Sequence, residues 1–312
     1  QPEPVRAAAL NYLGRIATPG ALAALAAAPA DAATAGATLA AAETLIARDE
    51  LKQAEPLYAR LYRSNAADPL RLAAFAGLVR TDTANTVALL TEGLTHPSPV
   101  WRGTAARLAA QLPEKTLAKQ GPKLMKALPP ESRLALADAL VASKNKAGAP
   151  LLRAALENDD DTSTRLAAAS GLGDLGSADD VPALIALLGH PEAALADAAR
   201  MSLIKLADPK TDSRLVRALG KDDGNAQART RLISTVTFRK STGAAPKLVP
   251  CLADTDPAVR TATVQALTEL AGEKQLADLF AAACKTTDAK EKRAAEKALS
   301  VLARRYPAAA TG

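Results

Sequence analysis

Apolar positions along the chain follow the spacing of amphipathic helices, and the same pattern returns every 30 to 33 residues. The clearest copy runs from Asp256 to Gly272, and similar segments run from Asp161 to Gly176 and from Asp68 to Arg80. The copies align on one position, most often Arg, which we call the anchor. The anchors are Arg6, Thr38, Arg71, Trp101, Arg133, Arg165, Ala196, Arg229, Arg260 and Lys292.

The residue seven places after each anchor is aliphatic in all ten copies. These residues are Leu13, Leu45, Leu78, Leu108, Leu140, Leu172, Leu203, Val236, Leu267 and Leu299. Three places after the anchor the residue is small, except at Leu136 and Leu232. Offsets 0, 3, 7 and 10 share one face of a helix with 3.6 residues per turn. Each copy therefore predicts an amphipathic helix.

A second helical pattern precedes every anchor after the first, as in the segment DDVPALIALLG from Asp179 to Gly189. Four of these helices carry a proline in the first turn, where its missing N–H costs nothing. These prolines are Pro56, Pro150, Pro182 and Pro246. Pro250 lies one turn later and is expected to kink its helix. Each copy is thus a helix–turn–helix that buries its apolar face only by stacking on its neighbours.

The helix pair, the Asp/Pro turn and the second helix of the form Ala…Ala-Leu…Leu-Gly resemble HEAT repeats. More narrowly, they resemble the short bacterial HEAT-like repeats first recognised in phycobilisome lyases. The resemblance covers essentially the whole chain and implies an all-α superhelix, a single HEAT-type solenoid over residues 1–312, with about nine helix pairs plus an orphan first helix. Its second helices are expected to start near residues 5, 38, 70, 101, 132, 164, 196, 228, 259 and 291. The repeat register also predicts helix for Ser234 to Phe238, whose composition (STVTF) favours strand.

The resemblance implies a structural role for the basic anchors. In HEAT proteins the turn Asp of one repeat bonds the Arg of a neighbour, which forms a ladder. The expected members are Arg71, Arg133, Arg165, Arg229, Arg260, Asp68, Asp161 and Asp256. Such pairs also satisfy amides at the start of the second helix. The alternative is a phosphate-binding stripe of basic side chains.

The composition fits a helical array but restricts function little. Apolar residues make up 48% and charged residues 23%, while aromatic residues at 3% are too scarce for a typical sandwich or barrel. The Ala-rich composition favours a bacterial source with GC-rich DNA. The formal charge of +6, from 39 Lys and Arg against 33 Asp and Glu, weakly favours an acidic partner.

The sequence leaves the compartment open. No apolar run approaches the ~20 residues that a transmembrane helix needs, and no signal peptide is visible. The chain starts at Gln1 rather than Met, which predicts a processed product or an excised piece of a longer protein. We expect a soluble protein that is cytoplasmic, or exported after processing.

No group of residues forms a recognisable active site, so we predict a non-enzyme with no catalytic residue, metal or cofactor. His96 and His190 lie in equivalent turns three copies apart, too far from each other to converge on a ligand. Cys251 and Cys284 occupy nearly the same place in adjacent first helices, whose ~8–10 Å spacing exceeds the reach of a disulfide. We expect buried free thiols. Nucleotide-binding, metalloprotease and esterase motifs are absent from the sequence.

Residues at offsets 5 and 9 from each anchor point away from the apolar face of the second helix. By resemblance to HEAT proteins, the second helices line the concave side of the solenoid. Most residues at these offsets are small or mixed polar residues, without the continuous basic track that nucleic acid requires. One local exception comprises Met201, Lys205, Phe238, Arg239 and Lys240. Apolar and basic residues at exposed offsets in adjacent copies resemble an anchor site for a peptide or helix. Alternatively, this repeat is rotated, and Met201 and Phe238 belong to the core.

The pattern therefore predicts a protein–protein interaction scaffold, a module of a larger bacterial protein or complex, with a protein or peptide partner of unknown identity. One alternative is a nucleic-acid-binding protein like the HEAT-fold alkylpurine DNA glycosylases. These use a cationic concave face with aromatic and acidic catalytic residues, which Trp101 alone does not supply. Another alternative is an enzyme accessory or lyase-like subunit, although no chromophore site can be identified.

The array begins half-way through a repeat. The helix that carries Arg6 and runs to about Ile16 has no preceding partner helix, and its sequence is mainly apolar. Terminal repeats normally present a polar outer face, which the Lys- and Arg-rich C-terminal helix does. We therefore expect the N-terminal end to dock on a helix supplied from elsewhere.

Overall fold

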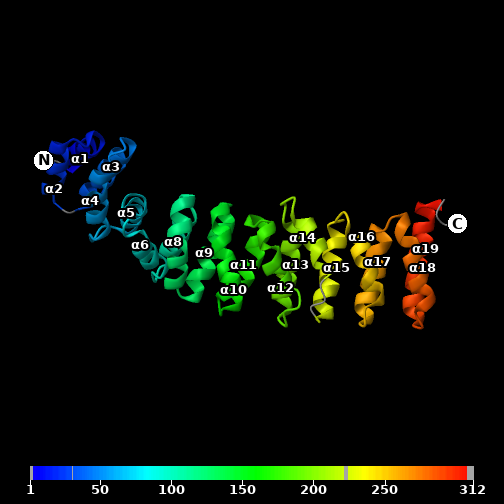
Figure 1. Cartoon of the computed structure of the whole chain (residues 1–312). Coiled ribbons are helices and arrows are strands. Elements are labelled where there is room, and N and C mark those ends of the chain that lie inside the picture. Colours follow the sequence, from blue (N-terminus) through cyan, green and yellow to red (C-terminus); the bar gives the residue numbers. More distant parts are fainter. Residues whose placement is uncertain (1–2, 30, 221–223, 308–312) are drawn as a thin grey trace. The chain divides into compact units, whose positions relative to one another are not determined.

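The computed structural model describes residues 3–29, 31–220 and 224–307, and every regular element within them is helical (Figure 1). These residues form nineteen α-helices and four short 3₁₀ helices, with no strand among them. The all-α class is confirmed. The segment Ser234 to Phe238 lies inside helix α15 (Ala226–Phe238), where Ile233 and Val236 are buried. The helical period is what places both apolar side chains on the packed face, so the repeat register overrides the local strand preference.

The chain divides into two compact units, residues 1–139 and 140–312, which we describe separately. The helices that begin in the first unit are α1 (Glu3–Ile16), α2 (Pro19–Ala27), α3 (Ala32–Ala47), α4 (Leu51–Tyr62), α5 (Asp68–Thr81), α6 (Thr86–Leu94), α7 (Pro99–Ala110), α8 (Glu114–Ala127) and α9 (Pro130–Ser143). Those of the second unit are α10 (Ala149–Asn158), α11 (Thr162–Leu175), α12 (Val181–Ala186), α13 (Ala193–Lys205), α14 (Thr211–Ala218), α15, α16 (Ala244–Leu248), α17 (Pro257–Leu270), α18 (Leu276–Lys285) and α19 (Ala289–Arg305).

Odd-numbered helices are the second helices of the repeats, and even-numbered helices are the first helices. Within each unit a second helix packs on its own first helix and on the next second helix, as α13 packs on α12 and α15. The core follows these second helices. Seven of the ten aliphatic residues at offset 7 are buried, whereas Leu13, Leu108 and Leu299 are half-buried. Stacked helix pairs therefore bury the face that the periodicity predicts.

The copy around Trp101 is displaced by one residue from the predicted register. Arg102, not Trp101, donates to backbone carbonyls of the preceding turn, as Arg260 does in a later repeat. Trp101 instead lies in the core, 2% exposed. As a result Ala106 and Ala110, which occupy predicted exposed offsets, are buried.

Turn residues begin several helices as the sequence indicates, but Pro56, predicted in a first turn, lies inside α4. The carboxylates of Asp31, Asp161, Asp256 and Asp288 cap the N-termini of α3, α11, α17 and α19. The helix with Pro250 changes form at this residue, because α16 ends at Leu248 and a 3₁₀ segment follows. Proline lacks the N–H that would continue the α-helical ladder.

The two cysteines are both free, Cys251 half-buried and Cys284 exposed. The prediction of a buried thiol is therefore wrong for Cys284, which is exposed near the end of α18. No helix in the described part of the chain has the length and apolarity that crossing a membrane requires.

Helix α1 packs on α2 and α3, with Leu10 buried. Val5 and Tyr12 on the same helix are 54% and 64% exposed. Docking of this end on another helix stays a prediction. Gln1, on which the processing hypothesis depends, lies outside the described residues.

Candidate functional site

Met201 and Phe238 lie on two neighbouring second helices, Met201 on α13 and Phe238 at the last residue of α15. Met201 is 45% exposed and Phe238 is 68% exposed, so neither belongs to the core. Apart from the displaced copy and half-buried Ala76, the positions at offsets 5 and 9 are likewise exposed. Phe238 and Met201 are therefore large apolar side chains on a surface of mainly small and polar residues.

The ends of α13 and α15 are held together by Arg239. Its Nη1 donates to three backbone carbonyls at the C-terminus of α13, those of Leu203, Ile204 and Leu206, at 2.8 to 2.9 Å. This contact places the end of α15, with Phe238, beside the end of α13, with Lys205. Met201 lies one helical turn before Lys205. The four predicted residues Met201, Lys205, Phe238 and Lys240 thus gather at the ends of two packed helices.

Arg239 itself is directed into the protein. Its Nε lies 2.8 Å from a carboxylate oxygen of Asp212, and the hydroxyl of Ser241 donates to the same carboxylate at 2.6 Å. Hydrogen bonds from Arg239 lower the pKa of Asp212, although partial burial acts in the opposite direction. The Arg239 side chain is 12% exposed. Its guanidinium is occupied within the protein, so we assign Arg239 a structural role and not the partner contact that the sequence suggested.

The two lysines remain accessible. Lys205 Nζ lies 3.6 Å from Asp174, and both side chains of this pair are about half exposed. Lys240 is exposed and takes a left-handed backbone conformation, φ 52°, which ends α15. The surface therefore combines two apolar side chains with two ammonium groups, and we call it the α13–α15 surface: Met201, Lys205, Phe238 and Lys240.

The anchor arginines make contacts of two kinds. Arg229 and Arg260 reach carboxylates of the following repeat, Asp254 at 2.9 Å and Glu291 at 2.6 Å. Arg6 likewise pairs with the carboxylate of Asp31 in the following repeat. Three further anchors donate to backbone carbonyls near the end of a preceding helix: Arg71 to Tyr62, Arg133 to Leu128 and Arg165 to Leu156. Arg71 also pairs with Asp68 of its own helix. We propose that the anchors hold each second helix to its neighbours.

Two turn carboxylates of the predicted ladder cap the helices that follow them. Asp161 accepts from the backbone N–H of Thr164 at 2.7 Å, and Asp256 accepts from that of Ala258 at 2.7 Å. Accepting these bonds satisfies N–H groups that a helix start leaves without partners. The carboxylates that Arg229 and Arg260 contact are therefore different from those that the sequence analysis selected.

A second set of ion pairs, not predicted from the sequence, connects the first helices of the second unit. Arg153 lies 2.6 Å from the fully buried Asp180, which also accepts from the backbone N–H of Ser177. Arg214 lies 2.5 Å from Asp179. The signal that could have revealed Asp180 is the capping-box spacing Ser-x-x-Asp from Ser177. No group of three or more metal-ligating side chains gathers anywhere in the described residues.

Comparison with known proteins identifies the repeat. A family model of HEAT repeats matches residues 117–204 and 202–300, which together are more than half of the chain. The chain belongs to the HEAT-repeat family. Its membership in the short bacterial, lyase-like type stays a prediction, and no curated protein matches the sequence.

Among solved structures, the HEAT-repeat chain is similar to the karyopherin Kap121p bound to the extreme C-terminus of the protein phosphatase Cdc14p, with 13% identity and a TM-score of 0.49. That match covers 95% of this chain and 42% of the karyopherin. Kap121p bound to RanGTP matches at 12% identity with a TM-score of 0.49, over 97% of this chain and 42% of that one. The chain thus spans about two-fifths of the length of these structures. A similarity at this level carries no argument about its partners.

Proposed function

We propose that this HEAT-repeat chain is a protein-interaction scaffold and that the α13–α15 surface binds a protein or peptide partner. The observation that supports the proposal is the exposure of Phe238, 68%, the highest among the large apolar side chains of the described residues. Met201 on the neighbouring helix is 45% exposed. Aromatic residues and Met are enriched at protein interfaces, and a few such anchors supply most of the binding free energy.

The charges beside the apolar pair favour a partner with an acidic residue next to its own apolar contact. Lys205 and Lys240 supply two ammonium groups at this surface. The Lys205–Asp174 pair is half exposed, and such surface pairs contribute little stability, so Lys205 can exchange Asp174 for a carboxylate of the partner. Complementary charge of this kind mainly adds specificity and speeds association. A non-enzymatic role, as a module of a larger bacterial protein or complex, is part of the same proposal.

The test is a double variant, Met201→Ala with Phe238→Ala, compared with wild type in affinity capture from an extract of the source organism. Wild type should retain a protein that binds through this surface. The double variant should capture at least about tenfold less of it, because truncating two anchor side chains costs more than ~1.4 kcal/mol of binding free energy. Both side chains are exposed, so the melting temperature should not change.

The matched control is Phe280→Ala. Phe280 is 62% exposed but lies on a first helix, α18. This variant should retain the same proteins as wild type. Equal capture of every retained protein by wild type and by the double variant would contradict the proposed surface.

A further inference from the structure

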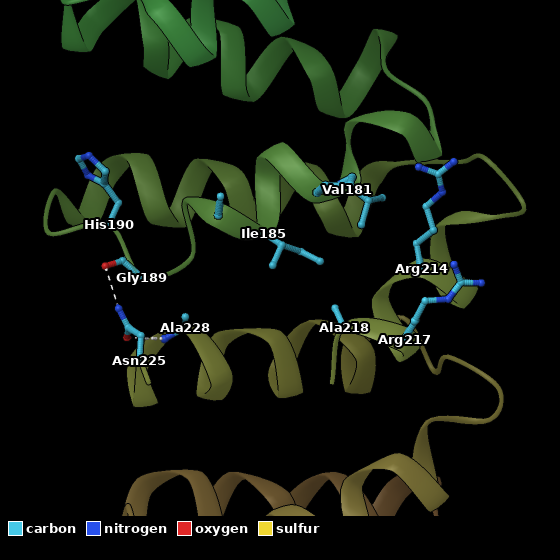
Figure 2. A pocket seen from close by; sticks show the side chains of 11 residues that line it. Val181, Ile185, Gly189, His190, Arg214, Arg217, Ala218, Asn225 and Ala228 are labelled. Carbon is cyan, nitrogen blue, oxygen red and sulfur yellow. Dashed lines mark hydrogen bonds between the residues drawn. The ribbon is translucent and has the colours of Figure 1, made fainter. Parts of the chain in front are cut away.

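A groove of about 660 Å³ lies between the first helices α12 and α14 of the second unit (Figure 2). Its middle is apolar, with Val181 and Ile185 on one wall and Ala218 and Ala228 on the other. In Figure 2 the side chain of Ile185 points from α12 toward Ala218. Ligand pockets typically have volumes of about 300–1,000 Å³ and apolar linings with a few polar groups. The groove fits this description.

The groove exists because the facing helices are short and their facing side chains are small. Helix α12 has 6 residues and α14 has 8, whereas α10 of the preceding repeat has 10. Ala186 of α12, Ala218 of α14 and the adjacent Ala228 of α15 leave space along the groove unfilled. A large side chain at the exposed position of Ala186 would fill part of this space.

One end of the groove is fixed by Asn225. Its Nδ2 donates to the Gly189 carbonyl at 3.3 Å, and its Oδ1 accepts from the Ala228 N–H at 3.0 Å (Figure 2). A Cβ at Gly189 would lie 2.2 Å from Asn225 Nδ2, so only glycine permits this contact. The groove is therefore formed before any partner binds, which reduces the entropic cost of binding.

A smaller cavity of about 120 Å³ shares Ile185, Ala218 and Ala228 with the groove. Its other walls include Leu232 and Ile233 of α15, both buried, together with Leu219, Arg229 and Cys251. The apolar middle of the groove thus leads toward a space of side-chain size. A single aliphatic side chain of a bound segment can enter there and act as an anchor.

The opposite end of the groove is cationic. Arg214 and Arg217 extend side by side from α14 in Figure 2. Arg214 pairs with Asp179. Arg217 is exposed, and no carboxylate within residues 3–29, 31–220 and 224–307 lies within ion-pair distance of it. An acidic group at this end would therefore find a guanidinium that can bind it in bidentate geometry.

We propose that this groove binds a short peptide segment of a partner protein, in which an aliphatic side chain enters the space beside Ile185 and Ala218 and a nearby Asp or Glu pairs with Arg217. The site is separate from the α13–α15 surface. Ala228 lies near the start of α15 and Phe238 at its end, about 15 Å apart along the helix. The scaffold would then carry two independent peptide sites, and this one does not depend on the first.

The test selects a displayed library of random peptides on wild-type protein and measures the enriched peptides, labelled with a fluorophore, against variants. The expected peptides combine an aliphatic residue with a nearby Asp or Glu. Arg217→Glu, which repels the carboxylate, and Ala186→Trp, which fills the groove, should each weaken binding at least tenfold. Both positions are exposed, so both variants should melt like wild type.

Two controls separate this site from the rest of the surface. Arg293→Glu changes an exposed arginine of α19 in the same way, and Met201→Ala with Phe238→Ala alters the α13–α15 surface. Both should leave peptide binding unchanged. The proposal is overturned if no peptide is enriched, if the enriched peptides bind the two groove variants as tightly as wild type, or if the α13–α15 variant abolishes their binding.

Discussion

The guanidinium of Arg239 donates five hydrogen bonds, two to the carboxylate of Asp212 and three to carbonyls at the end of α13. A helix leaves its last carbonyls without partners inside the helix. Arg239 supplies those partners from the next repeat, and Asp212 balances its charge. One side chain therefore closes a helix end and joins two repeats.

We expect Arg239→Ala to lower the free energy of unfolding by about 3 kcal/mol, because it leaves a partly buried carboxylate and several carbonyls without their donor. Urea unfolding at neutral pH, followed by circular dichroism, measures the change. Arg293→Ala, at an exposed position on α19, should stay within about 0.5 kcal/mol of wild type. Equal stability of the two variants would return Arg239 to the candidate partner contacts.

At the scale of helices, close approach depends on small residues. A Cβ at Gly14 of α1 would lie 2.6 Å from the carbonyl oxygen of Ala37 in α3. A Cβ at Gly36 of α3 would have no atom within 4 Å. The two glycines lie on helices that pack together, yet only Gly14 is required by the packing.

Opposite effects are expected from alanine at these two positions. Gly14→Ala should destabilise the protein by about 1–3 kcal/mol, since α1 must move away from α3. Gly36→Ala should stabilise it by up to about 1 kcal/mol, because alanine favours the helix and meets no neighbour. Thermal unfolding of both variants is the measurement. A shift of the same sign in both would contradict the helix contact.

Periodicity was sufficient to predict the helices, because burial of one face requires apolar residues at fixed offsets. It placed the copy around Trp101 one residue out of register, because a buried aromatic residue precedes the arginine there. The partners of the charged side chains were harder to predict. Asp180 and Arg153 belong to adjacent repeats, and their contact depends on how the repeats stack. The offsets indicated that Met201 and Phe238 are exposed, but the sequence also allowed a rotated repeat with both residues in the core, and only the structure excludes this.

For the molecule as a whole, the charge pattern argues against nucleic acid as the main partner. Acidic residues such as Glu43, Asp138, Asp174 and Glu269 occupy exposed offsets on the second helices, between basic ones. A phosphate backbone needs a run of cationic contacts, and its binding weakens steeply with salt.

Binding to duplex or single-stranded DNA should therefore be weak at low ionic strength and lost at about 0.2 M salt. Filter-binding or gel-shift titrations at two salt concentrations measure this. The same titration with Lys205→Glu should differ little, since no continuous track is interrupted. Sub-micromolar, sequence-selective binding at physiological salt would instead favour the nucleic-acid alternative.

The hydrogen bonds of Arg239 to the end of α13 also affect how the second unit unfolds. Repeat proteins gain stability from each unit and from each interface between neighbours. Because carbonyls of α13 are satisfied by a residue that follows α15, unravelling of α15 also uncaps α13. These hydrogen bonds stabilise the interface between the two repeats, so separating them at this point costs more free energy. We therefore expect the two repeats to unfold as one cooperative unit.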